Sequence, residues 1–451
     1  MALTTWSGSA SCAPTVILEP TSEAEIVEIV RRAAGEGKRV KAVGAAHSFS
    51  AIAMTDGVVL RLDRMAGIVR VDKQRNHVAA QAGMRLREFN AALDREGLAL
   101  PIVGSIEEQS LAGLVATGTH GSSLRHGNLS TVVVAMRLVT GKGEVLVLAE
   151  GDLRLPAARL GLGALGIVTE ITFAVEPAFR ISEGTVPMGF DAAVDAFPAF
   201  AQQHEYAKFW WIPHTNRAQL FRGARSDAAS TFSEGLRRFD AHVVNGVVFP
   251  ALLGLGNSVP ALIPPLNAVI GAVYFQPKTV VGPSHRVLGL AMPPVHRESE
   301  FAIPLEHAGV ALHRLRALIV ERNLHINFIL EARLVRADDT WMSPAYGRDT
   351  VQIGAYTTYL GDKAAWFAGA EAIFRDYDGR PHWGKELALD AARVRALYPR
   401  ADDFLALVRE LDPAGVFWNG FLEQVFGGVS PRGVGSGALH SGGVHLSIPN
   451  G

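Results

Sequence analysis

Short apolar runs broken by polar residues dominate the first third of the chain. Five segments have the length and alternation of single β-strands: TVILEP, KRVKAVG, GVVLRL, GIVRVD and HVAAQAG. The longer stretch TVVVAMRLVTGKGEVLVLA reads as two strands joined by a turn that contains glycine. GIVTEITFAVEP is one further strand, which stops at Pro177.

Helical periodicity is rarer in this part of the sequence. Ser22 and Glu25 have the spacing of a capping box, and apolar residues recur at helical intervals after them. The segment LREFNAALDREG predicts a second helix that ends at Gly97. Several strands and few helices favour an α+β fold over a doubly wound sheet.

The character of the sequence changes after Pro177. The stretch FDAAVDAFPAFAQQHEYAKFWWIPHT mixes a helix with an aromatic strand, and the end of the chain is rich in Gly and Ser. We therefore expect two domains, a short C-terminal segment and a mobile tail, which cover residues 1–178, 179–415, 416–427 and 428–451.

One apolar segment, from Ala241 to Pro277, contains no Asp, Glu, Lys or Arg. A membrane-spanning helix needs about 20 apolar residues. Prolines interrupt every window of that length here, at positions 250, 260, 264 and 265. The segment therefore predicts a buried or surface-lying helical hairpin rather than a membrane-spanning helix. Such a hairpin would allow weak contact with a membrane through residues 241–277.

Composition narrows the classes of partner. The 451 residues are 48% hydrophobic, which suffices for large cores, and the net charge of −1 gives no basic stripe for nucleic acid. Cys12 is the only cysteine, so no disulfide forms within the chain, and the N-terminus lacks the features of a signal peptide. We expect a cytoplasmic protein, with membrane association as the alternative.

Two glycine-containing motifs suggest a nucleotide site. GLGALG at 161–166 matches G-x-G-x-x-G, but a strand-like run follows it where a Rossmann motif would open a helix, so we reject a Rossmann site. The segment GSIEEQSLAGLVATGTHGSS at 104–123 joins a helix to a loop of Gly, Ser and Thr. Its backbone N–H groups and hydroxyls suit a pyrophosphate, although a tight structural turn would look the same.

These motifs, together with VGAAHSFSAIAMTDG at 43–57, resemble the FAD-binding PCMH-type domain of the vanillyl-alcohol-oxidase family. Downstream, HEYAKFWWIPHT, EFAIP, ILEARLVRADD, YGRD and PHWGK are similar to the sugar-lactone and alditol oxidase branch of that family. The resemblance continues through LYPRADDFLALVRELDPAGVFWNGFLEQVFG, to about residue 427. It implies a two-part FAD domain and a substrate, or cap, domain with a mixed or antiparallel sheet and flanking helices.

The resemblance implies a covalent FAD. In covalent members of this branch a histidine in G-x-x-H-S bonds to the flavin 8α-methyl carbon, and His47 matches that position. A neutral imidazole is a suitable nucleophile for this reaction. G-x-G-H is common there, whereas this chain has Ala45 and Ala46, which are still small. The alternative is a loop histidine beside non-covalent FAD.

The resemblance implies that further residues bind the cofactor and that the site holds no metal. They are Val43, Gly44, Ala45, Ala46, Ser48, Phe49, Gly104, Ser105, Gln109, Gly113, Thr117, Gly118, His120, Gly121, Gly166, Ile167, Val168 and Asn419.

Four residues match the branch's catalytic positions: Glu331, Arg333, Lys385 and Ser105. Positions i and i+2 share one face of a strand, so Glu331 and Arg333 can point at one site. Arg333 and Lys385 could stabilise a developing alkoxide, or one of them could serve the flavin N1 and C2 carbonyl region. Glu331 would orient the substrate or these cations, and it is the only carboxylate considered as a base. No catalytic role is assigned to the histidines at 120, 126 and 382.

We therefore expect an FAD oxidase of an aldonolactone such as L-gulono-1,4-lactone, which forms an ascorbate-type product and hydrogen peroxide. Residues 227–300 resemble the longer insertion of the lactone oxidases. Gly104 matches a position where glycine or proline accompanies the use of molecular oxygen, because a β-carbon there could block its approach. The alternatives are an alditol oxidase, a lactone dehydrogenase with another acceptor, and a flavin-carrying protein without turnover.

Overall fold

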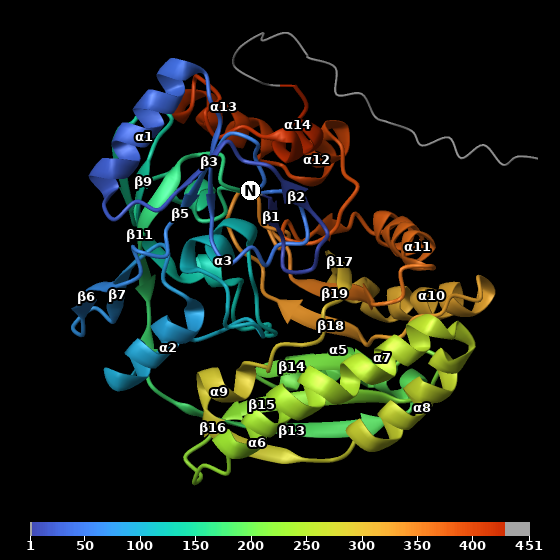
Figure 1. The fold of residues 1–451 in the computed structure, drawn as a ribbon. Helices are drawn as coiled ribbons and strands as arrows, with labels where there is room; N and C mark the ends of the chain where they lie inside the picture. The colour runs from blue at the N-terminus through green and yellow to red at the C-terminus, as the bar shows by residue number, and fades with distance from the viewer. Residues whose placement is uncertain (1, 429–451) are drawn as a thin grey trace, which may run out of the picture.

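The computed structural model describes residues 2–428, which form two lobes (Figure 1). The first lobe contains a parallel sheet in the order β3-β5-β4, from Val16–Leu18, Val58–Arg61 and Val40–Val43. Helix α1 (Glu23–Glu36) connects β3 to β4. Ser22 caps this helix by accepting a hydrogen bond from the backbone of Glu25. The Glu25 carboxylate binds Thr21 rather than Ser22, so the predicted capping box is only half formed.

A five-stranded antiparallel sheet completes this lobe, in the order β10-β9-β11-β7-β6. These strands cover Val145–Ala149, Val133–Val139, Ile167–Ala174, His77–Gln81 and Ile68–Asp72. Helices α2 (Leu86–Arg95), α3 (Leu111–Thr117) and α4 (Leu155–Ala158) and the 3₁₀ turn η1 (Leu129–Val132) pack near it. Small antiparallel pairs join β1 (Leu3–Thr4) to β2 (Ser11–Cys12) and β8 (Leu98–Ala99) to β12 (Glu176–Pro177).

The second lobe is built on an eight-stranded antiparallel sheet, in the order β16-β13-β15-β14-β18-β19-β17-β20. These strands cover Thr279–Pro283, Arg180–Met188, Ala218–Arg225, Tyr206–Trp211, Leu330–Val335, Thr350–Thr357, Arg297–Pro304 and Arg380–Pro381. One face packs in an apolar core with α5 (Phe190–Gln203), α10 (Ala308–Glu321) and α11 (Lys363–Arg375). The turns α9 (Ser284–Leu288) and η4 (Leu305–His307) flank the sheet.

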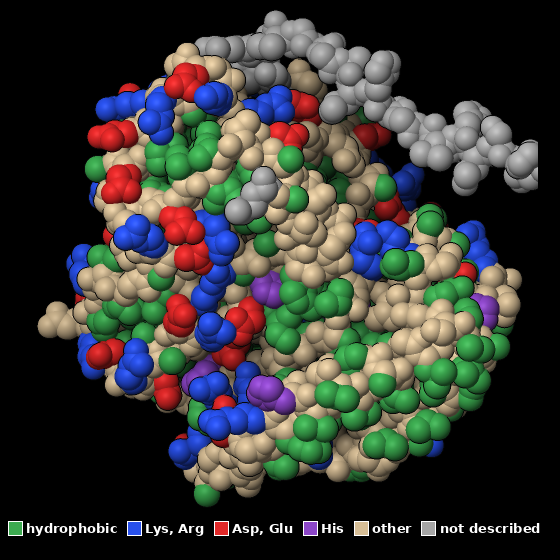
Figure 2. Space-filling model, viewed as in Figure 1, with side chains coloured by type: hydrophobic (Ala, Val, Ile, Leu, Met, Phe, Trp, Pro, Cys, Tyr) green, Lys and Arg blue, Asp and Glu red, His purple; other side chains and the backbone are tan. Residues whose placement is uncertain are grey.

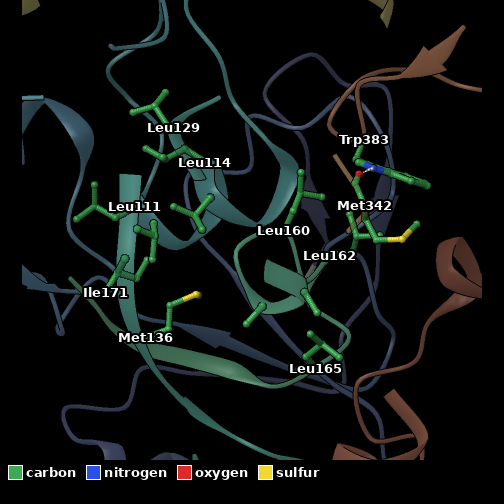
Figure 3. Packing of buried hydrophobic residues seen from close by; sticks show 14 of the residues in the cluster. Leu111, Leu114, Leu129, Met136, Leu160, Leu162, Leu165, Ile171, Met342 and Trp383 are labelled. Carbon is green, nitrogen blue, oxygen red and sulfur yellow. Dashed lines mark hydrogen bonds between the residues drawn. The ribbon is translucent and has the colours of Figure 1, made fainter. Parts of the chain in front are cut away.

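The C-terminal helices return to the first lobe. They are α12 (Ala391–Leu397), α13 (Ala401–Leu411) and α14 (Gly420–Phe426), and their apolar residues share a core with α2, α3 and β9. Figure 3 shows Met342 and Trp383, which come from the second part of the sequence, beside Leu160 and Leu162 of this core. The predicted boundary at residue 415 lies between α13 and α14, and residues of both helices belong to this core. Most of the predicted tail, residues 429–451, lies outside the described residues.

The apolar segment forms a helical hairpin on the surface. Helices α6 (Glu234–Phe239), η2 (Asp240–Val248) and α7 (Phe249–Ser258) run on as one helix, and η3 (Pro260–Leu262) leads into α8 (Ile263–Tyr274). The hairpin lies on the surface of the protein rather than in its interior. Figure 2 shows its exposed hydrophobic side chains at the lower right. Pro250 also does not interrupt the first helix. The residues before it adopt π-helical hydrogen bonding, which accommodates the missing N–H group.

The predicted α+β class is confirmed, since antiparallel sheets dominate and helices cover their faces without alternating regularly with strands.

Candidate active site

A deep cavity crosses the first lobe between the parallel sheet, helix α3 and the antiparallel sheet. Many of the residues predicted to bind the cofactor line it, namely Val43, Gly44, Ala45, Ala46, His47, Ser48, Gln109, Gly113, Thr117, Gly166, Ile167 and Val168. The loop at 161–166 lines it too and then enters strand β11, so the glycine motif precedes a strand, as the sequence predicted. Lys41 adds a buried ammonium group that donates to the Gly163 carbonyl at 3.0 Å.

Glycines bring the cavity walls together. A β-carbon on Gly44 would lie 1.9 Å from the Ser110 hydroxyl, and one on Gly166 would lie 2.7 Å from the Val139 carbonyl. Only glycine therefore allows the loop after β4 to approach helix α3, and β11 to begin beside β9. The cavity is lined largely by backbone and small or aliphatic side chains, with His47 among them, and this lining fits FAD.

The loop that carries His47 has an unusual backbone. Ala46 has φ of +53°, in the left-handed region, and its carbonyl accepts a hydrogen bond from the Trp6 backbone at 2.8 Å. The Trp6 ring lies 5.7 Å from the His47 ring. Burial lowers the pKa of His47, which favours the neutral imidazole that a nucleophile requires.

The eight-stranded sheet presents a polar face towards the site. Strand register places Trp210, Glu331, Gly354 and Glu300 in one row across β14, β18, β19 and β17. The next row contains Lys208, Arg333 and Gln352. Because directly opposed residues share a face, these side chains lie together. Three buried polar atoms of this face, Glu298 Oε1, Arg333 Nε and Gln352 Oε1, have no hydrogen-bond partner among the described residues, which is typical of a site that binds a polar ligand.

Glu331 is held by three donors. Arg333 Nη2 donates at 2.5 Å, Trp210 Nε1 at 2.7 Å and the Tyr356 hydroxyl at 3.1 Å. Burial opposes ionisation of the Glu331 carboxyl, but Arg333 outweighs it and holds the pKa below its usual range. A carboxylate bound in this way is a weak base, so the arrangement favours an orienting role for Glu331.

Lys385 binds Glu298, and its ammonium group lies 4.9 Å from the centre of the Phe49 ring. The loop with Lys385 also contacts the His47 loop directly. The Phe49 backbone donates to the Gly384 carbonyl at 2.6 Å, and the Ser50 hydroxyl donates to the Trp383 carbonyl at 2.8 Å. The predicted tether and the predicted cation thus lie on loops that are bonded together.

Ser105 and Arg333 both line a separate small hollow, which Gly121 and Lys208 also line. Besides Phe49, four other predicted residues line neither the cavity nor the hollow. Gly118 has φ of +74° and ends helix α3, and Gly104 packs against Thr119. Asn419 caps α14 and donates to three carbonyls of residues 51–54, so it supports the loop after His47.

His120, the remaining one, belongs to a buried cluster with Glu300 and His382. His120 Nε2 lies 3.2 Å from Glu300 Oε1, while His120 Nδ1 donates to the Gly121 carbonyl at 2.9 Å. His382 Nδ1 accepts from the Gly384 backbone at 3.0 Å, so its Nε2 carries the hydrogen. A protonated Nε2 is not a metal ligand, and the tautomers therefore favour a proton-binding cluster over a metal site.

The sequence analysis did not single out Trp210, Glu298, Glu300, Gln352 and Tyr356. One signal existed: two glutamates alternate in RESEFAIP and so share a face of one strand. Their place beside Glu331 depends on the order of four strands, which the local pattern does not contain.

Comparison with known proteins agrees with this geometry. The profile of the D-arabinono-1,4-lactone oxidase family matches residues 171–425, and that of an FAD-binding domain matches residues 14–149. An L-gulono-1,4-lactone dehydrogenase of Mycobacterium tuberculosis is 35% identical over 94% of this chain and 98% of its own length. An alditol oxidase of Streptomyces is 33% identical over 95% and 99%.

Among solved structures, a cholesterol oxidase from B. sterolicum aligns with a TM-score of 0.80 over 94% of this chain and 96% of that one. Its 15% identity supports the shared fold alone. The family profile and the full-length relatives carry the assignment further, and the chain belongs to the D-arabinono-1,4-lactone oxidase family of FAD-dependent oxidoreductases.

Proposed function

We propose that this enzyme oxidises a sugar 1,4-lactone similar to L-gulono-1,4-lactone. The observation that carries the proposal is the polar face of the cap sheet, where Glu331, Arg333 and Gln352 lie beside the hollow that Ser105 lines. Its unpaired donor and acceptor atoms suit a small polyhydroxylated molecule. Several relatives are named for lactones. Because one relative is named an alditol oxidase, an acyclic polyol is the second candidate.

The mechanism assigns a task to each group of the site. FAD, held by the residues that line the cavity, would supply the hydride acceptor for the carbon that carries the reacting hydroxyl. Arg333 and Lys385 place positive charge where the alkoxide develops, and Glu331 fixes the Arg333 guanidinium in position. Ser105, which lines the same hollow as Arg333, supplies a hydroxyl.

The direct test is anaerobic reduction of the bound flavin by a series of lactones and alditols. We expect a lactone to bleach the flavin fastest, whereas faster reduction by an alditol would select the second candidate. Glu331→Gln, Arg333→Ala and Lys385→Ala should keep the flavin but slow its reduction by about 10²–10³. Near-normal rates in all three variants would contradict the site.

We further propose that His47 bonds covalently to FAD. The supporting observations are its place in the cavity lining and the lowered pKa that leaves its imidazole neutral. The denatured enzyme should retain flavin fluorescence on a gel, and His47→Ala should lose that band. Complete release of flavin from the wild-type protein by acid would refute the tether.

Molecular oxygen is the proposed electron acceptor, with hydrogen peroxide as product, on the basis of Gly104. A β-carbon at this position would lie 2.7 Å from Thr119 Cγ2, so Gly104→Ala alone displaces Thr119. Thr119→Ser removes that methyl group and keeps the hydroxyl that hydrogen-bonds to Gln109. In the double variant Gly104→Ala/Thr119→Ser, oxygen should therefore reoxidise the flavin slowly, while the substrate reduces the flavin at a near-normal rate. Sluggish reoxidation of wild type, with fast turnover on an artificial acceptor, would indicate a dehydrogenase.

The surface hairpin supports weak membrane contact, and the single cysteine supports a reducing, cytoplasmic compartment. The helix Glu234–Ser258 is long and apolar enough to cross a membrane, with 11% of its most apolar stretch buried. However, Asn257 of this helix and Asn267 of α8 hydrogen-bond the hairpin to residues 213, 326 and 327 of the cap domain. We therefore propose that the hairpin lies along a membrane surface and does not cross it.

A further inference from the structure

Each of the three buried carboxylates of the polar face has its own cationic partner. Glu331 binds Arg333, Glu298 binds Lys385, and Glu300 faces His120. Arginine and lysine remain charged near neutral pH, whereas an imidazole gains and loses its proton there. His296 Nε2 also lies 3.6 Å from Glu298, but among the described residues Glu300 is the one of these three carboxylates that faces an imidazole without an arginine or lysine bound to it.

The hydrogen bonds show where this proton would reside. His120 Nδ1 donates to the Gly121 carbonyl, so a neutral His120 turns the lone pair of Nε2 towards Glu300. A lone pair facing a carboxylate oxygen at 3.2 Å is unfavourable until one proton is placed between them. Without that proton the pair is consequently a strong proton acceptor.

His382 completes the arrangement. It lies beside Glu300 at the sheet edge, where its backbone donates to the Glu300 carbonyl at 2.9 Å. Burial lowers the pKa of His382 to about 3, so its ring stays neutral and keeps hydrogen on Nε2. A ligand hydroxyl placed in the cluster would therefore accept a hydrogen bond from the His382 N–H group and donate one to the Glu300 carboxylate.

We propose that the His120–Glu300 pair accepts the proton of the substrate hydroxyl, while His382 donates a hydrogen bond to that oxygen. The O–H bond breaks, its proton moves to Glu300 and then to His120 Nε2, and its electron pair forms the carbonyl bond of the product. The C–H bond breaks at the same carbon, and its hydrogen leaves as hydride, with two electrons, for the bound flavin. This inference rests on the proposed function and assigns the base to Glu300 in place of Glu331.

The electrostatics of Glu300 support the imidazole as the final position of the proton. Burial opposes ionisation of the Glu300 carboxyl, but His120 and Lys385 hold its pKa well below the usual range. The charged and titratable groups around Glu300 come from four directions: His120 after α3, His382 and Lys385 after β20, Glu331, Arg333 and Tyr356 on β18 and β19, and Glu298 on its own strand.

The pair should give the reduction half-reaction a characteristic pH profile. A proton already shared between His120 and Glu300 blocks the transfer, so the limiting rate of flavin reduction should rise with pH and then level off. Anaerobic stopped-flow mixing with L-gulono-1,4-lactone, from about pH 5 to about pH 9, measures this profile. Glu300→Gln and His120→Gln should each lower the plateau by about 10²–10⁴ and abolish the pH step, with little change in lactone affinity.

A matched control exists outside the site. His126 Nε2 lies 3.4 Å from Glu205 Oε1, in another His–Glu pair with a similar N–O distance, in which Arg225 also donates to the carboxylate. Glu205→Gln should retain the wild-type plateau and pH step. If both site variants keep the wild-type pH step, the proposal is overturned. If Glu300→Gln fails to bind flavin, His120→Gln alone decides, by the same criterion. Should neither lactone nor polyol reduce the wild-type flavin, the proposed function fails instead, so the two failures are distinguishable.

Discussion

At the scale of single residues, Ala46 adopts a backbone conformation that alanine rarely occupies. Its φ of +53° costs about 1–2 kcal/mol for a residue with a β-carbon. Glycine at this position removes that cost. It also gives the unfolded chain more conformational freedom, which reduces the gain in stability by about 0.4–1 kcal/mol. We expect Ala46→Gly to raise the free energy of unfolding by roughly 0.5–1 kcal/mol, as measured by denaturant titration. The neighbouring variant Ala45→Gly, at a residue without positive φ, should lower it, and equal effects in both would contradict the argument.

Gly354 controls the position of Tyr356. A β-carbon on Gly354 would lie 2.4 Å from the Tyr356 ring, whose hydroxyl binds Glu331 and whose ring stacks on Phe328. We expect Gly354→Ala to displace this ring and lower kcat/KM for the lactone by at least about tenfold, because a small misplacement of orienting groups is costly.

Tyr356→Phe separates the ring from its hydroxyl. It removes one of the three hydrogen-bond donors to Glu331 but keeps the aromatic ring in place. Its loss of kcat/KM should therefore be smaller than that of Gly354→Ala. Steady-state kinetics on both variants decide the question. An unchanged Gly354→Ala enzyme would show that the ring does not form part of the site.

At the scale of elements, the local patterns predicted most strands of the first lobe and the hairpin of residues 241–277. They failed where an interaction is non-local. Glu298 and Glu300 were visible as alternating charges, but only the order β18-β19-β17 places them beside Glu331. The prediction that Pro250 interrupts the apolar segment is wrong, because sequence alone does not reveal the π-helical turn that accommodates it.

The hairpin is also the element whose outer surface we expect to contact lipid. Val247, Val269 and Val273 are 63%, 60% and 68% exposed, whereas Leu253 is 8% exposed. Replacing the three valines by serine should change the free energy of unfolding by less than about 0.5 kcal/mol each and reduce sedimentation with lipid vesicles. Leu253→Ser should instead destabilise the hairpin by about 1–3 kcal/mol, because it removes packing at the protein side. Unchanged vesicle binding by the serine variant would exclude these valines from the contact.

At the scale of the whole molecule, the cofactor cavity joins parts that are distant in sequence. Its walls come from the loop after β4, helix α3 and the start of β11, and the His47 loop is bonded to the loop of Lys385 from the other lobe. A ligand in this cavity should therefore stabilise the assembled fold. The proposed tether would set how that stabilisation depends on concentration, because a covalently bound FAD does not dissociate.

His47→Ala converts this unimolecular arrangement into reversible binding. Its melting temperature should rise with added FAD, since a ligand at about 100 times its Kd contributes about 2.7 kcal/mol to stability. The wild-type protein, with the FAD tether proposed for His47, should show no such dependence in the same titration. Thermal melts over a series of FAD concentrations measure both proteins. A wild-type melting temperature that climbs with FAD as steeply as that of the variant would mean that the flavin exchanges freely, and that His47 lines the cavity without holding the cofactor covalently.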